Sequence, residues 1–134
     1  MSYANNPTSI LAGSGITVSP TTGSGARVIT ISSSGIVPVA VRVAVATPVV
    51  ASATTDEVIS IQVPGAVPVA VTLPLGVTGK VFTFKDGLGL ASVVAPITIT
   101  ANVLNTIDGA LTAVINTPFG SLSMVYDSTQ WILT

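Results

Sequence analysis

The chain has 134 residues, of which only 7% are charged and 49% are hydrophobic, and its formal net charge is −1. Soluble domains usually have about 25% charged residues, so we expect part of the surface to be buried against other chains. The balanced charge argues against broad electrostatic binding to nucleic acid or to anionic lipid.

The first 34 residues are rich in Ser, Thr, Gly and Asn. Two short segments in them, residues 15–18 and 27–32, have strand-like alternation and predict a β-hairpin. We therefore interpret residues 1–34 as an N-terminal arm and residues 35–134 as a compact domain. The opening residues contain no basic stretch followed by an apolar core, so we expect no secretory signal there.

From residue 35 onward, Val and Ile recur at every second position, as in residues 39–45 and 67–71. A period of two is typical of strands, and the nine prolines and twelve glycines leave no window for a convincing helix. The longest apolar stretch, residues 36–53, contains Pro38, Arg42 and Pro48, which argues against a membrane-spanning helix. The expected strands are 15–18, 27–32, 39–46, 58–63, 67–73, 80–85, 96–101, 111–116, 121–127 and 130–133.

Turn-forming residues separate these strands, among them Pro64-Gly65, Asp86-Gly87 and Asp108-Gly109. Short strands with turns at intervals of 8 to 12 residues are typical of sandwiches and barrels. The predicted fold is therefore all-β: an antiparallel β-sandwich or jelly-roll-like domain that carries an N-terminal β-hairpin arm.

The sequence offers little for catalysis, because it contains neither histidine nor cysteine. That removes the usual general base, the common nucleophile pairs and the main zinc ligands. The carboxylates are scattered, and we interpret most of them as turn caps rather than as a glycosidase pair or a calcium site; they are Asp56, Glu57, Asp86, Asp108 and Asp127. We expect no enzyme activity, no cofactor and no bound metal.

Three other features have two interpretations each. Arg42 interrupts an apolar strand and is either a charge that protects an edge strand or a residue of a subunit interface. Lys85 is either a binding cation or the partner of Asp86 in a local ion pair, and we favour the ion pair. The aromatic residues of the domain are either core or a sugar-stacking platform, and we favour the core; they are Phe82, Phe84, Tyr126 and Trp131.

A series of motifs in residues 47–134 resembles a β-structured domain of tail-fibre, head-fibre and other minor structural proteins of tailed phages. Its clearest members are Asp-Glu-Val-Ile at 56–59, Val-Ala-Val-Thr-Leu-Pro at 69–74, Gly-Lys-Val-Phe-Thr-Phe-Lys-Asp at 79–86, Pro-Ile-Thr-Ile at 96–99, Thr-Ile-Asp-Gly at 106–109, and Tyr-Asp and Gln-Trp at 126–127 and 130–131. The resemblance implies a homotrimer and no catalytic residues. It also implies a place in the virion, which is assembled in the host cytoplasm.

Together these observations predict a short homotrimeric capsid decoration protein or head fibre. The arm would attach it to a capsid or tail protein by adding strands to neighbouring chains, through Ile16, Val18, Val28, Ile29 and Ile31. The alternatives are the receptor-binding tip of a tail fibre and a carbohydrate-binding module, either of which would have a host surface glycan as partner.

Overall fold

The computed structural model describes residues 16–20, 29–33 and 39–134. The chain divides into two compact units, Met1–Pro38 and Val39–Thr134. Every regular element in the described ranges is a β-strand, as the sequence predicted. These ranges contain no helix long and apolar enough to cross a membrane.

The N-terminal unit contains the predicted pair of strands, β1 (Ile16–Pro20) and β2 (Ile29–Ser33). They are antiparallel, with Val18 opposite Ile31. The two segments in which the sequence predicted a hairpin are thus paired with each other.

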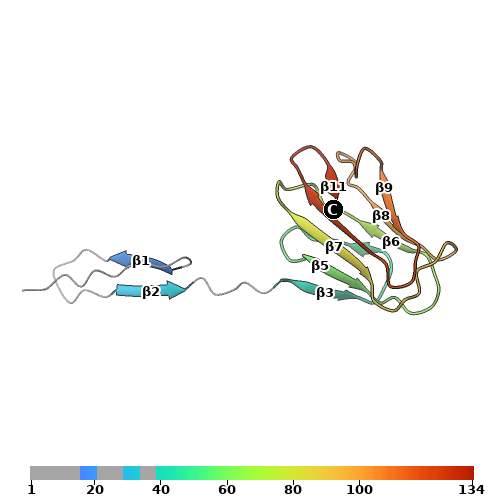
Figure 1. Ribbon diagram of the computed structural model, residues 1–134, viewed down its shortest axis with the longest axis horizontal. Coiled ribbons are helices and arrows are strands. Elements are labelled where there is room, and N and C mark those ends of the chain that lie inside the picture. The colour runs from blue at the N-terminus through green and yellow to red at the C-terminus, as the bar shows by residue number, and fades with distance from the viewer. Residues whose placement is uncertain (1–15, 21–28, 34–38) are drawn as a thin grey trace, which may run out of the picture. The chain divides into compact units, whose positions relative to one another are not determined.

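The C-terminal unit consists of two sheets (Figure 1). The five-stranded sheet has the order β11-β10-β7-β5-β3, and the four-stranded sheet has the order β4-β6-β8-β9. The strands are β3 (Val41–Ala44), β4 (Val49–Val50), β5 (Val58–Ile61), β6 (Val69–Thr72), β7 (Val81–Asp86), β8 (Ile97–Thr100), β9 (Thr112–Ile115), β10 (Ser121–Tyr126) and β11 (Trp131–Leu133).

From β3 to β8 the chain alternates between the two sheets. This part of the chain therefore winds as a coil, and each turn of the coil adds one strand to each sheet. Successive strands of one sheet are therefore parallel. Val58 of β5 lies between Val41 of β3 and Thr83 of β7, and Val71 of β6 lies between Val49 of β4 and Ile99 of β8. Only the last three strands are antiparallel to their neighbours, with β9 against β8, β10 against β7 and β11 against β10.

The expectation of an antiparallel domain is consequently wrong, because both sheets are mixed. That expectation assumed that strands adjacent in sequence pair as hairpins, which is the commoner arrangement. In this chain the connections from β3 to β8 cross from one sheet to the other instead. Each ladder then joins strands that are one full turn of the coil apart.

The two sheets share one hydrophobic core, to which β5, β6, β7 and β8 each contribute two alternate residues. These residues are Ile59, Ile61, Val69, Val71, Phe82, Phe84, Ile97 and Ile99, and none is more than 5% exposed. Full burial of a side chain of this size stabilises the fold by about 1.5 to 3 kcal/mol. The period of two thus directs one face of each strand inward.

Trp131 closes the core beside the aromatic residues of the five-stranded sheet. Its ring centroid lies 5.3 Å from that of Phe82 and 5.2 Å from that of Tyr126. Its Nε1 is buried and has no hydrogen-bond partner among the described residues. The prediction that Phe82 and Trp131 are core residues is confirmed.

Changing Trp131 or Phe82 to Ala should lower the free energy of unfolding by roughly 3 to 5 kcal/mol, because each change leaves a cavity in a close-packed core. Phe119→Ala is the matched control, since Phe119 is 60% exposed, and it should cost about 1 kcal/mol or less. Denaturant unfolding of the three variants measures the difference. An equal loss in all three would show that the burial of Trp131 and Phe82 does not determine stability.

Candidate functional site

The carboxylates of the domain accept hydrogen bonds from groups of their own chain. Asp127 accepts hydrogen bonds from the N–H groups of Thr129 and Gln130 at 2.7 and 2.8 Å, and Asp108 accepts one from Leu133 at 3.3 Å. Glu57 accepts one from Ala40, also at 3.3 Å. Within the described ranges, no three residues of the metal-binding types lie close enough together to hold an ion.

Asp86, the last residue of β7, organises the connection that follows. It is 2% exposed. Its Oδ1 accepts hydrogen bonds from the N–H groups of Leu88 and Gly89 at 3.3 and 3.0 Å. Its Oδ2 accepts those of Ala91 and Phe119 at 2.9 and 3.1 Å. One buried carboxylate therefore connects the β7–β8 and β9–β10 connections, as expected of a turn cap.

These bonds set the charge state of Asp86. Burial by itself would raise its pKa, but the N–H groups of Ala91, Phe119 and their neighbours stabilise the charged form. Together they hold the pKa of Asp86 below its ordinary value of 3.8. The carboxylate is thus ionised at neutral pH. Its hydrogen-bond partners are backbone N–H groups of the same chain.

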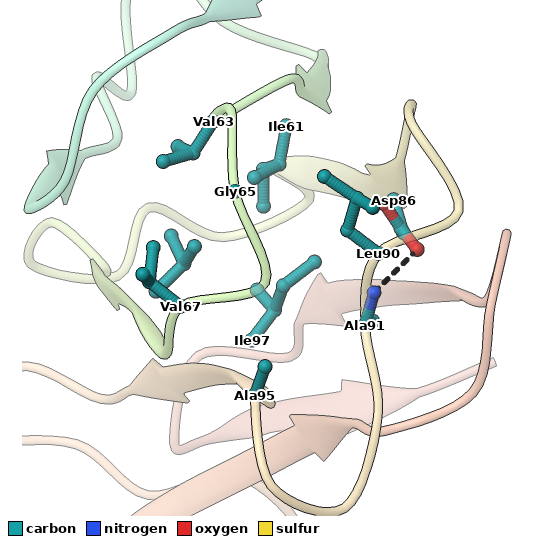
Figure 2. Close-up of a pocket in the computed structure, with 10 residues that line it drawn as sticks. Ile61, Val63, Gly65, Val67, Asp86, Leu90, Ala91, Ala95 and Ile97 are labelled. Carbon is teal, nitrogen blue, oxygen red and sulfur yellow. Dashed lines mark hydrogen bonds between the residues drawn. The ribbon is translucent and has the colours of Figure 1, made fainter.

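A small apolar hollow lies beside Asp86 (Figure 2). Its volume is about 10 Å³, which is room for about one water molecule. The lining side chains come from interior strands of both sheets and from the β5–β6 and β7–β8 connections, and they include Ile61, Val67, Leu90 and Ile97. A hollow of this size cannot hold a sugar or a cofactor.

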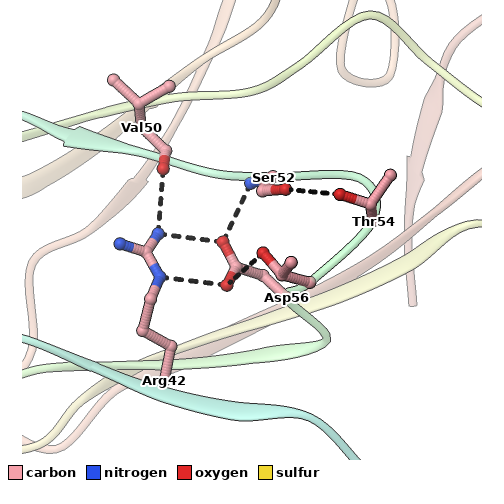
Figure 3. A network of polar contacts seen from close by, with 6 residues as sticks. Arg42, Val50, Ser52, Thr54 and Asp56 are labelled. Carbon is pink, nitrogen blue, oxygen red and sulfur yellow. Dashed lines mark hydrogen bonds and ion pairs between the residues drawn. The ribbon is translucent and has the colours of Figure 1, made fainter.

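Arg42 and the buried Asp56 form a second polar cluster (Figure 3). Arg42 Nε donates to Asp56 Oδ1 at 3.0 Å, its Nη2 lies 3.0 Å from Oδ2, and Nη2 also donates to the carbonyl oxygen of Val50 at 2.9 Å. The N–H group of Ser52 donates to Asp56 at 2.8 Å. The cluster joins β3 of one sheet to β4 of the other.

Arg42 is thus the charged residue of an edge strand, β3, and its guanidinium is paired within its own chain. Its participation in a subunit interface stays a prediction. The sequence revealed an unusual charge in an apolar strand, but it did not reveal Asp56 as the partner, because the two residues belong to different turns of the coil.

Lys85 does not form the predicted ion pair with Asp86, although both are described residues. Adjacent residues of a strand point to opposite faces of the sheet, and Asp86 points into the core. The Lys85 ammonium donates instead to the carbonyl oxygen of Phe119. Both residues therefore hold the β9–β10 connection, from opposite faces of β7.

The aromatic residues do not form a sugar-stacking platform. Phe82, Phe84 and Trp131 are fully buried, and Tyr126 is 8% exposed and accepts a hydrogen bond from the side-chain amide of Asn105 at 2.9 Å. Among residues 39–134 only Phe119 exposes an aromatic ring.

The most unusual surface of the domain is a row of exposed valines on the outer face of β3 and its two flanks. We call it the valine stripe: Val39, Val41, Val43 and Val45, which are 51 to 65% exposed. The sequence showed this alternation but not its direction. The inward positions belong to Arg42 and Ala44, and the outward ones to the large apolar side chains.

The residues expected to attach the protein to a particle lie in the N-terminal unit. Ile16 and Val18 belong to β1, and Ile29 and Ile31 belong to β2, whereas Val28 lies outside the described residues. The two strands pair with each other. Addition of these strands to neighbouring chains stays a prediction.

No protein-family model matches the chain, and no curated protein matches it significantly. The resemblance to phage structural proteins therefore rests on the sequence motifs alone.

Asp86→Asn should lower the free energy of unfolding at pH 7 by roughly 2 to 3 kcal/mol, because an amide group leaves part of the four N–H donors unsatisfied. Since the pKa of Asp86 is lower in the folded state, its stabilising contribution is complete above the unfolded value near 3.8. It disappears as the pH falls through the folded value. Unfolding of both proteins at pH 7 and pH 3 should show a smaller difference in acid, and a constant difference would contradict this explanation.

Arg42→Met should cost roughly 1 to 3 kcal/mol, because it leaves the Asp56 carboxylate buried beside an apolar side chain. The guanidinium is 38% exposed, so solvent screens part of the pair. Lys85→Met is the control, since Lys85 bonds a carbonyl group rather than a carboxylate. Thermal unfolding should show a larger loss of stability for Arg42→Met than for Lys85→Met. The double variant Arg42→Met, Asp56→Asn should recover part of the stability that Arg42→Met loses.

Proposed function

We propose that the protein is a structural component of a tailed-phage virion, a short homotrimeric capsid decoration protein or head fibre. In this proposal the arm of residues 1–34 attaches to the particle, and residues 35–134 form a β-sandwich knob that holds the trimer. The observation that carries the proposal is the amount of apolar surface on a domain with almost no charge.

The apolar surface is large for the size of the domain. Residues 39–134 include eighteen exposed large hydrophobic side chains, whereas the whole chain has nine charged residues. Large exposed apolar patches usually mark surfaces that other chains cover. Self-association supplies such a cover without any further partner.

The sandwich assignment is supported by two sheets that contribute to one core. The attachment role is supported by the composition of residues 1–34, which offer few apolar side chains for a core of their own. A two-stranded hairpin is marginally stable alone, so β1 and β2 would gain order from strands of a neighbouring chain.

The alternatives in which the outer face binds a host glycan have less support. A glycan site or receptor-binding tip would use exposed aromatic and arginine side chains. In the part of the chain that the structure describes, Arg42 is paired and four aromatic rings are buried.

A chain that begins at Gly35 should remain trimeric but fail to join particles that lack the protein, because it has lost the strands that add to the particle. Sedimentation gives its mass, and co-sedimentation with such particles gives its attachment. The full-length protein should attach at both low and moderate salt, since residues 1–34 contain one charged residue, Arg27. Decoration by the truncated chain, or release of the full-length protein by salt, would move the attachment to the domain.

A further inference from the structure

The outer face of the five-stranded sheet has an apolar side next to a neutral polar side. Its residues lie in register across the strands. Val41, Val58 and Thr83 occupy one row with Ser123, and Val43, Ser60 and Lys85 occupy the next with Ser121. In these two rows the valine stripe borders hydroxyl side chains, whereas the outward positions Val81 of β7 and Val125 of β10 form another apolar pair.

The outward positions of these strands offer no free charge. Beside the stripe, the exposed carboxylate of Glu57 accepts a hydrogen bond from the N–H group of Ala40. Among the outward residues of the described strands β3, β5, β7 and β10, only Lys85 is charged, and its ammonium donates to the Phe119 carbonyl of the same chain. Arg42 is paired with Asp56 on the inner side of β3. A partner would thus meet valine methyl groups and hydroxyls.

The strands beneath this surface are also parallel, since β3, β5 and β7 run in one direction. Parallel strands in folded proteins are mostly covered on both faces. The four-stranded sheet covers their inner face, and among the described residues nothing covers the valine stripe on the outer face.

We propose that the valine stripe is the surface through which copies of this chain associate, with the stripes of three copies meeting around a three-fold axis. This proposal rests on the proposed homotrimer and names its contact surface. Two further observations favour a second copy over a different protein.

The first observation is charge. A partner of ordinary composition has about 25% charged residues, and burying any of them against valine without an opposite charge would be costly. This chain has 7%, and the four residues of the valine stripe are uncharged, so identical stripes would bring apolar side chains together.

The second observation is the place where the rest of the chain begins. The domain starts at Val39, the first valine of the stripe, and residues 1–38 precede it. Association through the stripe would make the N-terminal segments of all three copies begin at the shared axis. Such an arrangement would suit attachment through those segments, because the three segments could act at one place on the particle.

The chain has no cysteine, so a single introduced cysteine can report contacts between copies. Val41→Cys should give a covalent dimer when the full-length protein is oxidised or treated with a short bis-maleimide, because equivalent residues near a three-fold axis lie close together. Val50→Cys is the matched control. Val50 also lies on an edge strand, β4 in the other sheet, and is 66% exposed against 65% for Val41. It should remain uncrosslinked.

A lysine in the stripe should dissociate the protein. Val41→Lys and Val43→Lys should sediment near the chain mass of 13.3 kDa at a micromolar concentration where the unchanged protein sediments at about three times that mass. Val50→Lys should remain a trimer. Trp131 fluorescence should be the same in all variants if the fold is intact. If a lysine variant does not fold, the cysteine variants still test the contact between copies.

The outcomes separate this proposal from the proposed function. If the unchanged protein is a monomer, the homotrimer and the stripe contact both fail. If it is a trimer, but Val50→Cys crosslinks and Val41→Cys does not, only the stripe is wrong. If the lysine variants in the stripe remain trimeric and lose attachment to particles, the stripe binds a particle protein and the proposal is overturned.

Discussion

The fold depends on supplying hydrogen-bond acceptors to the connections that carry the chain between its two sheets. In a coil, each turn leaves one ladder and enters another. Some N–H groups of the connections still donate to strand carbonyls, as Gly87 does to Ile61, but others have no strand partner. Buried N–H groups without partners are costly. Two buried carboxylates meet this requirement: Asp86 accepts four N–H groups, and Asp56 accepts that of Ser52 while it holds Arg42. The few charges of the chain are thus placed where the backbone needs them.

The sequence was sufficient for the strands but not for their partners. In residues 39–134, period-two patterning located every strand of more than two residues, because one face of each of these strands is buried more than the other. It missed β4, which has two residues and follows Pro48. It also gave the wrong direction of pairing, because a ladder between Val41 and Val58 or between Val69 and Ile97 leaves no local signal in the sequence.

The polar sites show the same limit. Asp86 and Asp127 were recognised as turn caps because most of their partners lie within a few residues, whereas the bond of Asp86 to Phe119 could not be read from the sequence. The pairing of Arg42 with Asp56 and the contact of Lys85 with Phe119 depend on segments that the fold brings together. The direction of the valine stripe was not predictable either, because alternation gives two faces without saying which one is buried. The small Ala44 and the paired Arg42 fit the inner side at this edge of the core.

The edges of the sheets explain why a face, rather than an edge, is the better candidate for association. An exposed edge strand can pair with strands of other chains unless it is short, charged or covered. The edge strands of both sheets are short, with four residues in β3 and β9, three in β11 and two in β4. The chain limits edge pairing by length, since its few charges are used elsewhere. What β3 presents to a partner is then mainly its outward row of valines, a surface that can join a fixed number of copies around an axis without extending a sheet indefinitely.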